Sequence, residues 1–119
     1  MSNIVTRAEA EAAAEYYSKF KVWHSVVATG THQELNWVKF EPGSTYPRHS
    51  HPYEQTSVLI QGRMRLTVGD EVREVGPGDM WFAPSGVPHG GEILGDEPVI
   101  FIDLYSPPSG GSDEATTYY

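Results

Sequence analysis

The sequence predicts an all-β fold, an antiparallel jelly-roll β-barrel preceded by one short N-terminal helix. From residue 22 onward, short apolar-polar runs alternate with Gly and Pro, which is typical of strands joined by turns. Between "RMRLTV" and "EVREV", Gly69-Asp70 forms the turn pair of a tight hairpin. Many short strands at this spacing favour a barrel or jelly roll, and 119 residues suffice for one core.

Three segments are expected along the chain. Residues 1–21 contain "TRAEAEAAAEYYSKF", which is rich in helix formers, and Thr6 with Glu9 has the spacing of a capping box. Residues 22–107 form the barrel. Its candidate strands are 22–28, 35–41, 48–51, 55–61, 63–68, 71–75, 79–83, 87–90 and 98–105. Residues 108–119 lose periodicity and gain Pro, Gly and Ser, so we expect a flexible C-terminal tail unless a partner subunit holds it.

The composition excludes several classes of protein. The chain has no cysteine, so disulfides, thiolate metal sites and cysteine nucleophiles are ruled out. A formal net charge of −8 argues against a nucleic-acid partner. No apolar run has the length of a membrane span, and the N-terminal residues lack the apolar core of a signal peptide. A cytoplasmic location and no membrane partner are therefore expected.

One short stretch, "YPRHSHPYEQ", carries the first candidate site. His49 and His51 are two residues apart, so in a strand both point to the same face. Gln55 shares their parity, whereas Glu54 has the opposite parity and should point away. Pro52 cannot donate to a strand ladder, so the strand is expected to break just after the histidines.

Two histidines and an amide leave a metal site incomplete, and His89 in "PSGVPHGG" is the candidate fourth ligand. His24 and His32 have no comparable setting, and we expect them to be surface or partly packed imidazoles.

These residues resemble the two motifs of the cupin family. The first motif, G-x5-H-x-H-x3,4-E-x6-G, is matched by Gly43, His49, His51 and Gly62, with Gln55 at the glutamate position. The second, G-x5-P-x-G-x2-H-x3-N, is matched by Gly78, Pro84, Gly86 and His89, with Ile93 in place of asparagine. The resemblance implies a jelly-roll barrel and one divalent metal ion at His49, His51, Gln55 and His89. Imidazole-rich sites suit Zn, Ni, Fe, Cu or Mn. A metal-free cupin pocket is the alternative.

The variant "HSHPYEQ" is similar to the small cupins of pectin and alginate breakdown, which open unsaturated uronates to linear keto acids. Those cupins share the His, His, Gln, His set and end in I-D-x-aromatic-S-P-x-R. Here "FIDLYSPPS" supplies Ile102, Asp103, Tyr105, Ser106 and Pro107. Ser109 stands at the arginine position and cannot provide a bidentate contact to a carboxylate. By strand parity Arg48, Arg63 and Arg65 should all point away from the ligand face, so none is expected to replace that arginine.

Asp103 and Tyr105 are the candidate catalytic residues. A carboxylate in the apolar run from Val99 to Tyr105 is costly to bury without a partner. Asp103 and Tyr105 share parity, so both can face the metal cavity. Asp103 is then a general acid or base, and Tyr105 a hydrogen-bond donor or stacking surface. An outward-facing Asp103 at the barrel edge is the alternative.

Three functions remain open from the sequence. The first is a metal-dependent enzyme acting on a small, oxygen-rich, carboxylated, sugar-acid-like metabolite by ring opening and tautomerisation, or as a lyase. A neutral amide ligand leaves the metal charge uncompensated, which favours polarisation of an anionic oxygen. The second is a cupin dioxygenase, and the third a non-catalytic module that binds a small molecule. A homodimer is expected because small antiparallel barrels leave edges that partner chains cover.

Overall fold

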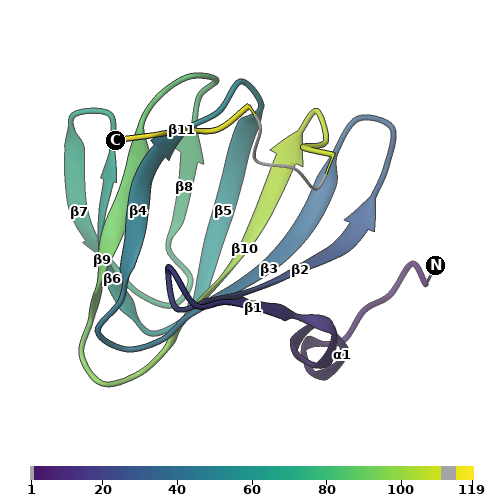
Figure 1. Cartoon of the computed structure of the whole chain (residues 1–119), viewed down its shortest axis with the longest axis horizontal. Helices are drawn as coiled ribbons and strands as arrows, with labels where there is room; N and C mark the ends of the chain where they lie inside the picture. Colours follow the sequence, from purple (N-terminus) through teal and green to yellow (C-terminus); the bar gives the residue numbers. More distant parts are fainter. Residues whose placement is uncertain (1, 111–114) are drawn as a thin grey trace.

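The computed structural model describes residues 2–110 and 115–119 and shows two antiparallel β-sheets stacked face to face (Figure 1). The elements in chain order are α1 (Arg7–Ala13), β1 (Glu15–Tyr17), β2 (Val22–Thr29), β3 (Glu34–Phe40), β4 (Thr45–Ser50), β5 (Glu54–Gln61), β6 (Arg63–Val68), β7 (Glu71–Val75), β8 (Met80–Ala83), β9 (His89–Leu94), β10 (Val99–Ser106) and β11 (Thr117–Tyr118).

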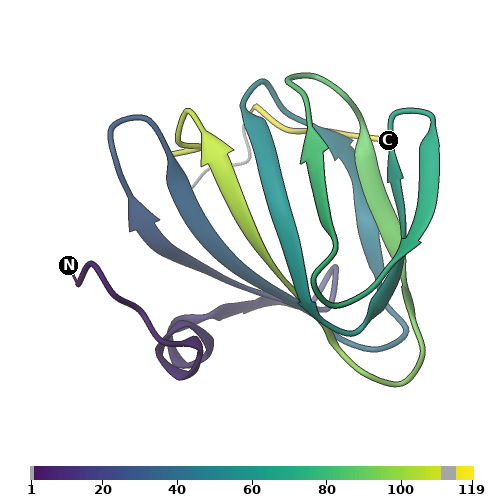
Figure 2. The ribbon, with the colours of Figure 1, turned by 180° about the vertical axis from the view of Figure 1, so that it is seen from behind.

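The strand order confirms the predicted jelly roll. One sheet runs β1-β2-β3-β10-β5-β8 and the other β11-β4-β9-β6-β7, so consecutive strands often lie in different sheets. Seen from behind, the larger sheet forms the near layer (Figure 2). Within the described residues no strand pairing joins the two sheets edge to edge, so the predicted barrel is corrected to a sandwich that does not close.

All nine strands expected from the sequence are present, with ends shifted by up to four residues. The N-terminal prediction was partly wrong. The Thr6–Glu9 capping box is present, but the helix ends at Ala13, because Ala14 is extended with φ −70° and ψ 141°. The next three residues form β1 and pair with β2, where Tyr16 packs on Trp23 with ring centroids 4.7 Å apart. Aromatic residues favour strands, which explains the switch.

The apolar core lies between the sheets and is built from the inward face of nearly every strand. Its buried members are Val22, Val38, Phe40, Tyr46, Leu59, Met64, Leu66, Trp81, Ile93, Val99 and Phe101. A smaller cluster lies on the outside of the larger sheet, where Ala10 of α1 packs with Trp37 and Ile100. The core therefore fills one part of the interior, and polar residues line the rest.

Glycine allows β4 and β9 to approach closely at the site. A Cβ on Gly90 would lie 2.8 Å from the Tyr46 carbonyl oxygen and 2.9 Å from Arg48 Cα. Such distances are too short for any other residue without a backbone shift, so Gly90 allows the strand bearing His89 to pack against the strand bearing His49.

The predicted C-terminal tail includes a strand that the sequence pattern did not indicate. Thr117 and Tyr118 pair with Ser50 and His49 of β4, and the Tyr119 N–H donates to the Arg48 carbonyl at 2.9 Å. Part of the expected tail, residues 111–114, lies outside the described residues. In residues 2–110 and 115–119, no helix is long and apolar enough to cross a membrane.

Candidate metal centre

Three segments bring the predicted metal ligands together at one end of the interior. His49 lies in β4, His51 directly follows β4, Gln55 is the second residue of β5 and His89 opens β9. A register shift between Tyr46 and His49 turns His49 inward against His89, its pairing partner. One ring nitrogen from each histidine lies within 4.8 Å of the others. Gln55 and His89 are fully buried, and β4 ends at Ser50, one residue earlier than the break predicted from Pro52.

The hydrogen bonds of the three histidines fix which ring nitrogen carries a proton. Each Nδ1 faces a backbone carbonyl: Pro47 O for His49 at 2.7 Å, Tyr53 O for His51 at 2.8 Å, and Val87 O for His89 at 2.9 Å. A carbonyl only accepts, so each Nδ1 carries the hydrogen.

Burial lowers the pKa of all three rings, that of His89 to about 4. The rings are therefore neutral near pH 7, and each Nε2 presents a lone pair.

Gln55 adds a fourth acceptor at the same point. Its Nε2 donates to Asp103 Oδ1 at 3.1 Å, Ser57 Oγ at 3.0 Å and Tyr46 OH at 3.2 Å. Its Oε1 consequently faces the imidazoles, 3.1 Å from His51 Nε2 and 3.0 Å from His89 Nε2. Neutral imidazole nitrogens and an amide oxygen thus converge without a hydrogen between them. A divalent cation satisfies all of these lone pairs, so the residues fit the metal that the sequence implied.

Asp103 lies directly behind this group and faces the interior, as its parity with Tyr105 predicted. It is 2% exposed, and its Oδ1 accepts from Ser57 Oγ at 2.5 Å as well as from Gln55. Its Oδ2 accepts from Tyr105 OH at 3.2 Å. Burial raises the pKa of Asp103 to about 7 against the opposing effect of these three hydrogen bonds. Burial also raises the pKa of Tyr105 well above its ordinary value, so its hydroxyl remains a donor.

A cavity of about 630 Å³ opens onto His49, Asp103 and Tyr105. Its rim comes from two distant parts of the chain: Lys19 and Phe20 from the β1–β2 turn, and Thr116 and Tyr118 from the C-terminal segment. Phe20 stacks on Tyr118 with ring centroids 5.7 Å apart. A second hollow of about 480 Å³ lies beside β7 and β8 and contains none of the ligands.

Four residues beside the predicted ligands were not among the predicted site residues. Ser57 has the same strand parity as Gln55, and that signal could have found it. Tyr46 precedes the register shift in β4, so simple alternation could not place it. Tyr53 stacks on His51 with centroids 3.9 Å apart and planes 9° apart, and it lines the cavity. The fourth, Asn36, is fully buried on β3 and is the direct cross-strand partner of Asp103.

Another polar network lies on β2 and β3, along the same wall of the cavity. His24 Nε2 lies 2.8 Å from Asn36 Oδ1, and Asn36 Nδ2 donates to Glu34 Oε2 at 3.0 Å. Ser109, at the arginine position of the resemblance, donates to both Glu34 oxygens at 3.1 and 2.9 Å. His24 is half-buried and lines the cavity, whereas His32 is exposed.

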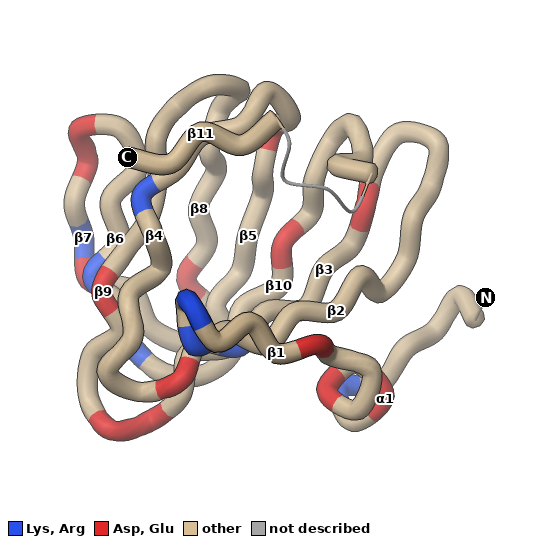
Figure 3. Tube along the Cα trace, viewed as in Figure 1, with Lys and Arg blue, Asp and Glu red and all other residues tan. Residues whose placement is uncertain are grey.

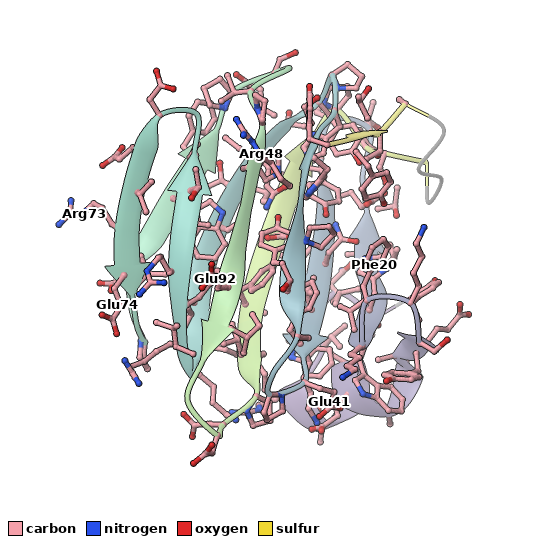
Figure 4. The ribbon with its side chains drawn as sticks, turned by 60° about the vertical axis from the view of Figure 1, so that its left-hand side comes forward. Phe20, Glu41, Arg48, Arg73, Glu74 and Glu92 are labelled. Atoms are coloured by element: carbon pink, nitrogen blue, oxygen red, sulfur yellow. The ribbon has the colours of Figure 1, made fainter. Side chains whose placement is uncertain are left out.

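The three arginines point away from the cavity, as parity predicted. Arg48 is exposed and lies over the Tyr119 ring, 5.8 Å from its centroid. Arg63 pairs with Glu74 on the surface, and Arg65 pairs with Glu92 at 3.1 Å. Figure 4 shows Glu74 and its neighbour Arg73 projecting outward from β7.

The match to a family model agrees with this geometry. Residues 36–105 match the Cupin_2 model, described as a cupin domain, and these residues include all four ligands and Asp103. The chain belongs to the cupin family. The matched region ends four residues before Ser109, so the model covers Asn36 but not the position of the missing arginine.

Individual cupins also resemble the chain. It is 30% identical over 86 residues to oxalate decarboxylase OxdC of Bacillus subtilis, covering 68% of this chain and 22% of that protein. It is 44% identical over 64 residues to dimethylsulfoniopropionate lyase DddQ of Ruegeria pomeroyi, covering 53% and 31%. The chain thus spans less than a third of these two curated relatives. The structure of KdgF from Halomonas sp. superposes with a TM-score of 0.68 at 30% identity, covering 76% of this chain and 83% of that one.

Proposed function

We propose that this cupin is a metal-dependent enzyme that opens the ring of a small, carboxylated, sugar-acid-like metabolite and tautomerises the product. The observation that carries the proposal is the convergence of four lone pairs beside a buried carboxylate, at the wall of a cavity. The motif resemblance to uronate-opening cupins supports the substrate class, and the match to KdgF agrees with it.

His49, His51, His89 and Gln55 would hold the cation, and all four are neutral. When bound, a divalent cation supplies a Lewis acid for a carboxylate or carbonyl oxygen. Because no ligand carries negative charge, the full charge of the cation remains available to an anionic substrate. The acidic balance of the chain, −8 in total, makes such a local positive centre necessary for binding an acid.

Asp103 is the proposed acid–base group. It accepts a hydrogen bond from Gln55 and lines the cavity beside the candidate ligands, so it would lie within reach of a substrate held there. Ser57 and Tyr105 fix its two oxygens in separate directions. Tyr105 also lines the cavity, and because its single O–H hydrogen is donated to Asp103, its hydroxyl oxygen would accept a hydrogen bond from a substrate hydroxyl.

The size and lining of the cavity suit one sugar-sized molecule. About 630 Å³ lies within the range of small-molecule sites. The Tyr53 and Tyr105 rings, with centroids 4.8 Å apart and planes inclined at 47°, offer an aromatic surface next to the metal ligands. A hydroxylated ring can stack on such a surface while its carboxylate meets the cation.

The test combines elemental analysis with a substrate screen. We expect the purified protein to carry about one divalent ion per chain. It should also consume a 4,5-unsaturated uronate, which is measured as a decrease in the ultraviolet absorbance of the substrate. Asp103→Asn should retain the metal and lower turnover by roughly 100-fold or more, the range of general acid–base catalysis. Asp70→Asn, in an exposed turn, is the matched control. A metal-loaded protein that leaves every uronate intact would contradict the proposal.

A lyase is the second candidate, because the chain is 44% identical over 64 residues to a dimethylsulfoniopropionate lyase. A lyase would release a product from an acyclic carboxylated substrate, and the same proton-abstracting Asp103 would serve. Turnover of an acyclic sulfonium acid, with no turnover of uronates, would identify it. Oxygen uptake during turnover would indicate a dioxygenase, and a carboxylate recovered intact from the cavity would indicate a binding module.

A further inference from the structure

We propose that His24 is a second proton-transfer group of this cavity, held in one tautomer by Asn36 and Glu34. The inference rests on the proposed function, because it assigns the second of two proton transfers in the same reaction. His24 is remote from both cupin motifs in the sequence, and nothing in the metal centre contacts it in the hydrogen bonds described above.

The direction of each hydrogen bond in the network follows from the Glu34 carboxylate, which can only accept. Ser109 Oγ donates to the carboxylate of Glu34. The carboxylate accepts, so the Asn36 amide presents its Nδ2 to Glu34, at 3.0 Å. Asn36 Oδ1 therefore points to His24, and His24 Nε2, at 2.8 Å, must be the donor. A neutral His24 then has its hydrogen on Nε2 and its lone pair on Nδ1.

This arrangement is the one that a general base needs. The base is held by one ring nitrogen so that the other can react, and an acidic group stands behind it. Glu34 is 1% exposed and Asn36 is fully buried, so the network is rigid and shielded from water. In the described part of the chain, Glu34 has no Lys or Arg partner within salt-bridge distance. Its negative charge consequently acts through Asn36 on the imidazole.

The position of His24 also suits a second transfer. His24 on β2, Asn36 on β3, Asp103 on β10 and Gln55 on β5 follow one another across neighbouring strands of the larger sheet. His24 and Asp103 both line the cavity. A substrate ring lying across this wall would present one end to the metal centre and the other to His24.

Ring opening of an unsaturated uronate needs two proton transfers at different atoms. The hydroxyl on the ring-closing carbon loses its proton, the O–H pair forms the new carbonyl, and the ring C–O bond breaks with its pair on the departing oxygen. The resulting enolate takes a proton on carbon to give the keto acid. His24 Nδ1 accepts the hydroxyl proton, and Asp103 delivers the proton to carbon. Solvent then returns the proton from His24 to Asp103, so nothing is consumed.

The kinetics of matched variants test whether His24 transfers a proton. His24→Ala should lower kcat by roughly 100-fold, the scale of general acid–base catalysis, while Zn²⁺ affinity stays unchanged. Added imidazole should restore part of the lost rate, because it can occupy the space left by the side chain. His32→Ala, on an exposed turn, is the control and should behave as wild type. If His24→Ala turns over normally while Asp103→Asn is inactive, this inference fails and the proposed function stands.

A second readout does not depend on turnover. In ¹⁵N spectra of the Zn²⁺-loaded protein, His24 should show a protonated Nε2 and an unprotonated Nδ1, and only Nδ1 should shift when D-glucuronate is added. Glu34→Gln should leave a mixture of His24 tautomers and lower kcat with little change in KM, as expected of a positioning residue. A hydrogen on Nδ1 of His24, or no shift with glucuronate, would overturn the inference. If uronates bind but no variant or wild type turns over, both this role and the proposed function are wrong.

Discussion

The two sets of polar residues along the wall of the cavity each combine buried and half-buried side chains, yet their hydrogen bonding is opposite. In the network of Glu34, Asn36, His24 and Ser109, each donor meets an acceptor. At the metal centre, three imidazole nitrogens and an amide oxygen meet with no donor among them. Burial of polar residues therefore does not by itself indicate a bound ion. A surplus of acceptors, with every proton already engaged elsewhere, does.

This contrast separates stability from metal affinity. The Glu34 network contributes to the folded state without help, because its bonds close among protein groups. The clustered acceptors of the metal centre destabilise the metal-free fold, and binding of a cation would offset this loss of stability. Substitutions at the two places should therefore affect different measurements.

The largest effect is expected from removing a ligand. His89→Ala removes one of the three candidate nitrogen ligands together with its whole ring. Zn²⁺ affinity should therefore fall by at least about 100-fold, which is the upper end of the losses caused by removing only a hydrogen-bond partner of a metal ligand. Competition with a chromogenic chelator measures the affinity. Wild type should also gain thermal stability on adding Zn²⁺ and the variant should not. An unchanged affinity would show that the three rings are not ligands. His32→Ala serves as the control.

A change at the closed network should affect stability instead. Glu34→Gln replaces a charged acceptor by a neutral amide, so the hydrogen bonds from Asn36 and Ser109 lose their charge assistance. The free energy of unfolding should fall by about 1–3 kcal/mol, measured by urea denaturation. Zn²⁺ affinity should remain that of wild type. Glu71→Gln, exposed on β7, is the control for the charge change. Loss of metal affinity in Glu34→Gln would show that the two regions are coupled.

An intermediate effect, on anion binding, is expected when a negative charge is introduced at the metal centre. Gln55→Glu would compensate the cation, raise metal affinity and weaken the binding of an anion by about tenfold, or 1.4 kcal/mol. The new carboxylate would also face Asp103, which now accepts a hydrogen bond from Gln55 at 3.1 Å. Calorimetric titration of the metal-loaded protein with D-glucuronate measures the change. Gln33→Glu on an exposed turn controls for net charge, and equal anion affinity in both variants would contradict the role of a neutral ligand.

The smallest effect is expected at the rim. Among the described residues that line the cavity, Lys19 is the one with a Lys or Arg side chain, and it lies in the basic β1–β2 turn (Figure 3). Its ammonium is exposed, so Lys19→Met should raise KM for a carboxylated substrate only about threefold, as expected of a screened surface charge. Lys21→Met, two residues on and outside the cavity lining, should have no effect. The difference between the two should shrink as salt is added.

The grouping of the candidate metal ligands could be predicted in part, because the signals of three of them are local. His49 and His51 lie two residues apart and Gln55 shares their parity, so alternation along a strand identified three of the groups. The apolar neighbours of Asp103 made an inward carboxylate conspicuous. The limits of β5, β6 and β7 followed from hydrophobic alternation and the Gly69-Asp70 turn.

The rest depends on contacts between segments far apart in the chain. His24 and Asn36 become partners only because β2 pairs with β3 in one register, and Ser109 reaches Glu34 across 75 residues. The inward turn of His49 requires a register shift that alternation does not predict. The strand β11 has two residues, too few for any periodic pattern, and exists because β4 offers an unpaired edge.

Phe20 stacks on Tyr118 at the rim of the cavity, so this rim is built from two segments that are far apart in the sequence. Neither segment contributes a metal ligand, and neither belongs to the matched cupin region. Admission of molecules can consequently diverge between related sequences by changes in these two flanks alone, while the inner chemistry stays fixed. Under the proposed function, the residues that would select a substrate at the cavity rim therefore lie in different segments from those that would act on it.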